Sequence, residues 1–200
     1  MTVPAAGPTS ISAAVILAGG RGQRLGGLDK PALQVDGRPL LDLALDAARG
    51  GPIVVVGPPR ALPAGVLGAI EDPPGGGPAA GVAAGFAALP ELPDGAFVAV
   101  LAADLPGIAA STVDRLSAAL SAEIQGSTDG AVLLDPGGRR QYLIGVWRYG
   151  ALQAAIGRRA SWHDAALREL LAPISVIQVA GSDHEAADID TPSDLGRWQT

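Results

Sequence analysis

Short, unbroken runs of apolar residues alternate along this chain with stretches in which alanine and leucine recur at helical spacing. Apolar runs of this length predict strands that are buried on both faces of a sheet. Helical stretches between such strands predict crossover connections, and therefore a doubly wound, mostly parallel α/β sheet flanked by helices. We expect strands at residues 13–17, 53–56, 97–101, 131–134, 143–147 and 174–179, and helices at residues 40–48, 79–89, 111–122, 150–157 and 161–171.

Local signals predict where some of these elements begin or turn. The pair Asp36-Gly37 is typical of a tight hairpin turn. A hydroxyl residue followed three positions later by a carboxylate is the pattern of a capping box at a helix N-terminus. We expect three such starts: Ser111 with Asp114, Ser161 with Asp164, and Thr191 with Asp194.

Size and composition predict one domain. The chain has 200 residues, of which 48% are apolar and 17% charged, enough apolar material for a sizeable core. We expect residues 13–200 to form this domain. Residues 1–12, rich in proline, alanine and serine, are expected to be a disordered tail without the basic start and apolar core of a signal peptide.

Charge and composition also exclude several functions. A net charge of -6 argues against nucleic-acid binding, which needs a positive field. The absence of cysteine excludes disulfides, thiolate nucleophiles and cysteine-based metal sites. No apolar run reaches the roughly 18–20 residues that span a bilayer, so we expect no membrane partner and a cytoplasmic location.

The only lysine of the chain, Lys30, ends a glycine-rich run that follows the first expected strand. Glycines let backbone N–H groups approach an anion closely, and Arg21, Arg24 and Lys30 place three cations in one loop. A Walker A loop is excluded because Asp29 precedes Lys30, and a dinucleotide-binding fingerprint is excluded because Leu25 occupies its third glycine position. The run therefore predicts a phosphate-binding loop, with a mobile solvated loop as the alternative.

Two later segments of the chain carry aspartates that are candidates for metal binding. Asp104 ends a fully apolar run and precedes a proline turn, where it can form a turn or hold Mg²⁺, which needs only one or two protein carboxylates. Asp188 and Asp190 share one face of an extended segment, and helix capping alone does not explain them. The glycine-rich residues 71–81 fit either backbone placed against a flat base or a simple flexible loop.

Four segments together resemble the molybdenum cofactor guanylyltransferases of the nucleotidyltransferase superfamily. They are Leu-Ala-Gly-Gly at residues 17–20 leading to Asp29-Lys30-Pro31, Glu71-Asp72-Pro73 with Gly77-Pro78, Ala103-Asp104-Leu105-Pro106, and the run from Asp188 to Leu195. Their order and spacing match from about residue 13 to residue 198. The resemblance implies a single Rossmann-like domain of the nucleotide-diphospho-sugar transferase type that transfers GMP from GTP to molybdopterin and releases pyrophosphate.

The resemblance also implies roles for individual residues. Lys30, Arg24 and Asp104 would be catalytic, and Asp104 and Asp190 would hold Mg²⁺. The molybdopterin-type acceptor would bind near two arginine pairs, Arg139 with Arg140 and Arg158 with Arg159, and near Gln141. For each arginine pair a solvated turn is the alternative. Transient contact with molybdoenzyme maturation proteins is also implied. The nucleotide would bind to Leu17, Ala18, Gly19, Gly20, Lys30, Asp72, Gly77 and Asp104.

Two positions bear on the base that is used. The pair Gly19-Gly20 favours GTP, because cytidylyltransferase relatives tend to have Ala-Ala-Gly there. Asp190 stands where guanylyltransferases often have asparagine and cytidylyltransferases aspartate. The alternatives are a cytidylyltransferase acting on molybdopterin, a guanylyltransferase acting on another phosphorylated acceptor, and a non-catalytic nucleotide-binding regulatory protein.

Overall fold

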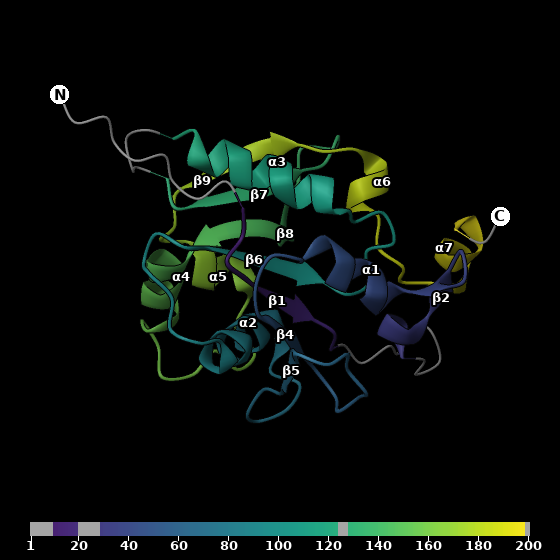
Figure 1. Cartoon of the computed structure of the whole chain (residues 1–200), viewed down its shortest axis with the longest axis horizontal. Coiled ribbons are helices and arrows are strands. Elements are labelled where there is room, and N and C mark those ends of the chain that lie inside the picture. Colours follow the sequence, from purple (N-terminus) through teal and green to yellow (C-terminus); the bar gives the residue numbers. More distant parts are fainter. Residues whose placement is uncertain (1–9, 20–28, 124–127, 199–200) are drawn as a thin grey trace.

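A seven-stranded sheet runs through the centre of the molecule, with helices on both faces (Figure 1). The computed structural model describes residues 10–19, 29–123 and 128–198. The strand order is β5-β4-β1-β6-β8-β7-β9. All neighbours are parallel except β8, which is antiparallel to both β6 and β7. The expected doubly wound, mostly parallel sheet is confirmed. Its strands are β1 (Ala13–Leu17), β4 (Ile53–Val56), β5 (Val66–Ala69), β6 (Phe97–Ala102), β7 (Gly130–Leu134), β8 (Arg140–Arg148) and β9 (Val176–Ala180).

Two hydrophobic cores lie on opposite faces of this sheet. Successive side chains of a strand alternate between faces, so in β1 Ala14 and Ile16 enter one core and Ala13 and Val15 the other. Helices α1 (Leu40–Ala47) and α3 (Ala110–Ser121) cover the first face. Helices α2 (Gly77–Ala88), α4 (Tyr149–Ile156) and α5 (Leu167–Leu171) cover the second. Burial on both faces explains why the strands are continuously apolar in the sequence.

A third, smaller core joins the segment around residues 30–40 to the C-terminal segment. The hairpin of β2 (Gln34–Val35) and β3 (Arg38–Pro39) follows the 3₁₀ turn η2 (Lys30–Ala32). Val35 of this hairpin and Leu40 pack with Ile189, which is fully buried. The C-terminal helix α7 (Pro192–Arg197) therefore lies beside β2, as Figure 1 shows.

The local signals have mixed outcomes. Asp36 and Gly37 have φ angles of 50° and 75°, which confirms the hairpin turn. The capping box of Thr191 with Asp194 is also confirmed, and an unexpected one, Ser182 with Glu185, begins α6 (Asp183–Ala186).

Two other expected helix starts are wrong. Helix α3 begins without a side-chain cap, after Ala109. Residues 161–166 are not helical, and α5 begins only at Leu167. The reason is a tertiary contact: the backbone N–H of Asp164 donates to the carbonyl oxygen of Gly76 at 2.9 Å, and Asp164 adopts a φ of 56°.

The expected tail, residues 1–12, falls mostly on residues outside the described ranges. Its last residues pack against the domain: Ile11 is buried, and the backbone N–H of Ser12 donates to the carbonyl oxygen of Phe97 at 2.7 Å. Within the described ranges, no helix is both long enough and apolar enough to cross a membrane.

Candidate active site

The carboxyl ends of β1 and β6 mark the point where the chain connections diverge. From β1 the sheet is built outward through β4 and β5 on one side, and β6 lies on the other side. Ligands of open α/β sheets bind at such switch points. The backbone N–H of Ala103 donates to the carbonyl oxygen of Leu17 at 2.9 Å, so the two strand ends stay in register. Gly19 and Asp104 therefore emerge at the same edge of the sheet.

A cavity of about 600 Å³ lies at this edge, a volume typical of small-ligand sites. The carboxyl ends of β1, β4 and β6 and the first turn of α2 form its walls. Ala18 is buried beneath it, and its N–H donates to the carbonyl oxygen of Val56 at 2.7 Å. The lining residues include Leu17, Gly19, Val56, Pro58, Pro59, Ile70, Glu71, Pro74, Gly75, Gly77, Pro78, Ala102, Asp104 and Leu143.

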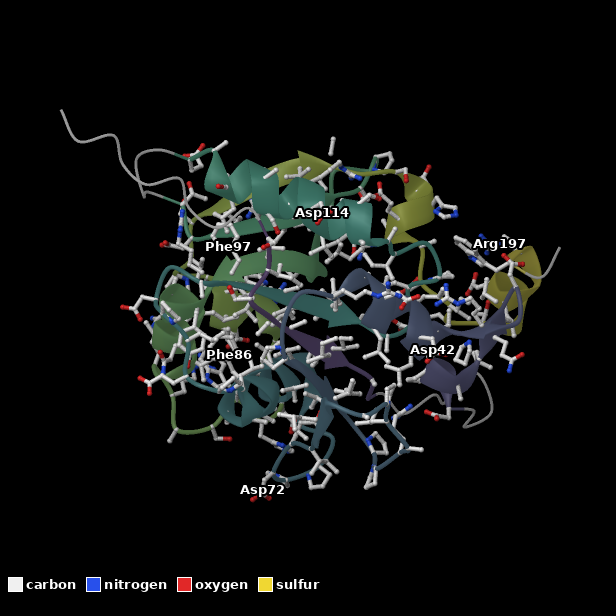
Figure 2. The ribbon with its side chains drawn as sticks, in the orientation of Figure 1. Asp42, Asp72, Phe86, Phe97, Asp114 and Arg197 are labelled. Carbon is white, nitrogen blue, oxygen red and sulfur yellow. The ribbon has the colours of Figure 1, made fainter. Side chains whose placement is uncertain are left out.

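One expected nucleotide contact does not line the cavity. Asp72 is exposed at the outer edge of the molecule, on the loop between β5 and α2 (Figure 2), and it is not among the lining residues. Its neighbour Glu71 lines the cavity instead. Sequence reasoning missed Glu71 because adjacent residues of an extended segment point in opposite directions and no motif shows which one faces inward.

Lys30 lies between two carboxylates, one of which, that of Asp104, lines the cavity. Its ammonium donates a hydrogen bond to Asp190, 160 positions away in the sequence, and lies 3.7 Å from Asp104 Oδ2. The side chain of Lys30 is only 18% exposed. Three residues that were expected to share the site are therefore brought together.

The charges of Lys30 and of the nearby aspartates act on one another. Burial alone would lower the pKa of the Lys30 ammonium, but the hydrogen bond to Asp190 and the charge of Asp104 outweigh it and raise that pKa. Burial raises the pKa of the Asp104 carboxyl; Lys30 opposes this rise, whereas the negative charge of Asp188 adds to it. Lys30 therefore stays protonated and holds the carboxylates together.

Asp104 and Asp190 are suited to Mg²⁺ of the kind that is bound jointly with phosphate. Mg²⁺ typically takes one or two carboxylates and completes its shell with phosphate oxygens and water. In the described part of the chain, no group of three or more histidine, cysteine, aspartate or glutamate side chains is arranged to hold a metal. The donor set thus fits a metal that arrives with a phosphorylated ligand, rather than a dedicated metal cage.

Arg60 holds the base of the glycine-rich segment. Its Nη2 donates to the carbonyl oxygen of Ala18 at 2.9 Å, and its Nη1 lies 3.2 Å from the carboxylate of Asp29. The side chain is 13% exposed. Nothing in the sequence singles out this arginine, because its partners are 42 and 31 positions away. Gly20 and Arg24, which were expected to contact the nucleotide, lie outside the described residues.

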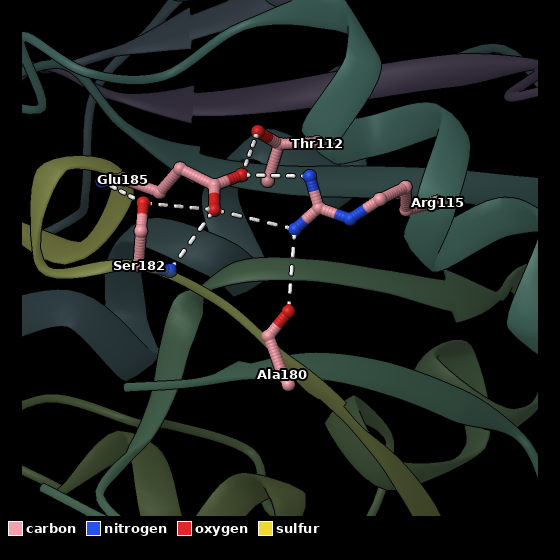
Figure 3. Close-up of polar contacts among 5 residues, drawn as sticks. All are labelled: Thr112, Arg115, Ala180, Ser182 and Glu185. Carbon is pink, nitrogen blue, oxygen red and sulfur yellow. Dashed lines mark hydrogen bonds and ion pairs between the residues drawn. The ribbon is translucent and has the colours of Figure 1, made fainter. Parts of the chain in front are cut away.

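A network at α6 anchors the segment that carries Asp188 and Asp190 (Figure 3). The Glu185 carboxylate accepts hydrogen bonds from Thr112 Oγ1 at 2.6 Å and from Arg115 Nη1 at 2.9 Å, both on α3. It also accepts from the backbone N–H of Ser182 at 3.0 Å. Although burial opposes it, the bonds from Arg115 and Thr112 lower the Glu185 pKa to about 2.

The first expected acceptor-binding group lies partly in a smaller cavity. This cavity, of about 230 Å³, is lined by Arg139 and Gln141 together with Asp135, Asp183, Ala186, Ala187 and Asp188. Gln141 Nε2 donates to Asp135 at 2.7 Å, which orients its side chain. Arg140 is exposed on β8 and is not among the lining residues.

The second arginine pair lines neither cavity. Arg158 is exposed. Arg159 lies 3.2 Å from the Glu169 carboxylate, and its guanidinium stacks over the Trp162 ring at 4.7 Å from the ring centroid. These contacts tie Arg159 to α5 and to Trp162.

Comparisons with known proteins identify the family and the fold of this chain. Residues 14–179 match the model of the MobA-like NTP transferase domain, whereas comparison with curated proteins finds no match. Among solved structures, Rv0371c from Mycobacterium tuberculosis H37Rv superposes with a TM-score of 0.70 at 20% identity, covering 94% of this chain and 97% of that one. Molybdopterin-guanine dinucleotide biosynthesis protein A from Archaeoglobus fulgidus gives 0.68 at 18% identity, covering 94% and 96%.

A cytidylyltransferase is also similar. The 2-C-methyl-D-erythritol 4-phosphate cytidylyltransferase from Thermus thermophilus gives a TM-score of 0.61 at 25% identity, covering 92% of this chain and 96% of that one. At such identities these structures establish the fold. The family match, however, spans most of the chain and both strands of the switch point. This chain belongs to the MobA-like NTP transferase domain family of nucleotidyltransferases.

Proposed function

We propose that this protein transfers GMP from GTP to molybdopterin in a Mg²⁺-dependent reaction that releases pyrophosphate. The observation that carries the proposal is the position of Lys30 between Asp190 and Asp104, because Asp104 lines the same cavity as Gly19 and Gly77. The Gly19-Gly20 pair and the fold shared with the Archaeoglobus protein support guanine and molybdopterin as the substrates.

The transfer replaces one phosphoanhydride bond by another. An oxygen of the acceptor phosphate attacks the α-phosphorus of GTP, the bond from that phosphorus to the bridging oxygen breaks on the opposite side, and pyrophosphate leaves. Such a reaction needs positioning and charge neutralisation rather than a protein nucleophile, which agrees with a chain that has no cysteine. Lys30 offsets the negative charge that develops on the departing phosphates.

The carboxylates have a complementary role. Asp104 and Asp190 are the residues that would hold Mg²⁺, which when bound supplies positive charge to the phosphate oxygens. Before substrate binds, Lys30 contacts the same two carboxylates and offsets part of their negative charge. In this proposal the ammonium therefore turns from the carboxylates toward the triphosphate when the nucleotide enters.

The smaller cavity supports an acceptor site beside this centre. Asp188 lines that cavity, and its charge acts on both Lys30 and Asp104. Arg139 is the cation in its wall, and Gln141 offers amide hydrogen-bonding groups to a pterin. Arg140, Arg158 and Arg159 lie outside it, so their part in acceptor binding rests on the resemblance alone.

Transfer of CMP is the second candidate. Asp190, where guanylyltransferases often have asparagine, and the 25% identity with the Thermus cytidylyltransferase favour it. Pyrophosphate release in the presence of Mg²⁺, molybdopterin and each nucleoside triphosphate in turn separates the two. We expect release with GTP and not with CTP. The reverse pattern would overturn the base assignment, and nucleotide binding without release would indicate a regulatory protein.

A further inference from the structure

Glu71 places a carboxylate in the wall of the larger cavity. It follows β5 closely, and its side chain is half-buried. A methyl group placed on Gly81 of α2 would lie 3.5 Å from Glu71 Oε1, and one placed on Gly19 would lie 3.8 Å from it. The carboxylate therefore lies between the end of β1 and the first turns of α2, where glycine leaves room for it.

This carboxylate has no partner within the described ranges. No cation or hydrogen-bond donor of those residues pairs with Glu71. Its neighbours in the cavity wall include Val56, Ile70 and Pro74, which offer no side-chain donor. An unpaired carboxylate in an apolar wall is unfavourable, and donors on a bound ligand remove that penalty.

The hydrogen-bonding groups of each nucleobase decide whether it can pair with the Glu71 carboxylate. A carboxylate has two oxygens that accept hydrogen bonds and no donor. Guanine presents two adjacent donors on its Watson–Crick edge, the ring N1–H and the 2-amino group, so both oxygens are satisfied. Cytosine and adenine present an amino group beside an unprotonated ring nitrogen. The lone pair of that nitrogen would face the second carboxylate oxygen, and two hydrogen-bond acceptors repel one another. Uracil places carbonyl oxygens on both sides of its single donor.

We propose that Glu71 selects guanine by accepting hydrogen bonds from N1–H and the 2-amino group of the base. The inference rests on the proposed function, because it requires a nucleoside triphosphate in this cavity. It goes further by naming the side chain that distinguishes GTP from the other nucleotides. A site built to satisfy two donors discriminates strongly against a base that lacks one of them.

The test compares binding of GTP, ITP and CTP by calorimetry, with Mg²⁺ present, to the wild type and to Glu71→Gln. ITP lacks only the 2-amino group. We expect the wild type to bind GTP about tenfold more tightly than ITP, the equivalent of one hydrogen bond to a charged group. Glutamine keeps the shape but offers one acceptor and one donor. Glu71→Gln should therefore weaken GTP binding about 10- to 100-fold and remove the preference over ITP, while CTP binding is unchanged or improved.

Glu91→Gln is the matched control, because Glu91 is exposed on the loop after α2 and lines no part of the cavity. It should leave all three affinities unchanged. If Glu71→Gln weakens all three nucleotides by one factor, or leaves their ranking as in the wild type, Glu71 supports the loop and does not read the base. If the wild type binds none of the three, the proposed function fails together with this inference.

Discussion

The guanidinium of Arg60 lies 3.2 Å from the carboxylate of Asp29, the residue that precedes Lys30. The same guanidinium donates to the carbonyl oxygen of Ala18, so residues 18 and 29 are held by one side chain. Asp29 is also the N-cap of η2, which begins with Lys30. Arg60 thus fixes the backbone from which Lys30 extends.

Replacing Arg60 by alanine should raise the KM for the nucleotide by about tenfold, because losing one charged hydrogen bond corresponds to roughly that factor. Asp29→Ala, which removes only the contact between Asp29 and Arg60, should have a smaller effect, and the double variant should be no worse than Arg60→Ala alone. Steady-state kinetics of the four proteins measure this. Arg49→Ala, which removes a 72% exposed arginine, is the control. Additive effects would show that Arg60 acts independently of Asp29.

Lys30→Ala should leave the fold intact and lower kcat/KM by about 10²- to 10³-fold, the usual effect of removing one charge-stabilising group. Lys30→Arg should not restore activity, because a planar guanidinium cannot occupy the place of a compact ammonium between two carboxylates. Circular dichroism and pyrophosphate release together check this expectation. Full activity in the alanine variant would exclude the phosphate role.

Asp104→Asn should stabilise the protein while abolishing transfer. The pKa of Asp104 is raised in the folded state, so its deprotonation makes folding less favourable as the pH rises through that pKa. Asparagine removes this penalty at neutral pH. We expect the thermal midpoint without Mg²⁺ to rise by about 2–4 °C, the shift that 1 kcal/mol produces in a domain of this size. A lower midpoint would mean that the Lys30 contact outweighs burial.

Glu185 should contribute stability that is lost in acid. Its folded-state pKa of about 2 lies below the ordinary value of 4.5, so its contribution is complete above pH 4.5 and declines as the pH falls toward 2. Denaturant unfolding of the wild type and Glu185→Gln should differ most near pH 7 and converge in strong acid. Glu91→Gln again serves as the control, and a difference that persists unchanged to pH 2 would contradict the role of the Glu185 charge.

The sequence predicted those parts of the fold in which burial leaves a clear pattern. β1 and β4 were predicted with their observed bounds, because they lie inside the sheet and are apolar on both faces. β5 was missed, since this edge strand contains Gly68 and exposes Leu67, so it lacks an unbroken buried run. The capping box expected at Ser161 failed because a tertiary contact, from Asp164 to Gly76, overrode the local preference.

Only some residues of the candidate site could be predicted from the sequence. Lys30, Asp104 and Asp190 could be named because each stands in a motif, and the geometry of parallel strands brings their loops to one edge. Their distance from one another could not be predicted. Arg60 stands in no motif, and its role depends on contacts with residues distant in the sequence. Glu71 stands in one of the matched segments, but that segment does not show that Glu71, rather than Asp72, lines the cavity. Such positions become visible only when the packing of the loops is known.

The small core of Val35, Leu40 and Ile189 has a consequence for how the protein becomes active during its synthesis. Lys30 leaves the ribosome early, but the aspartate that it contacts follows 160 residues later. Ile189 is fully buried beside the hairpin, and this burial places its neighbour Asp190 next to the ammonium. A nascent chain that ends before this isoleucine contains every strand of the seven-stranded sheet but lacks Asp190, so the contact between Lys30 and Asp190 cannot form.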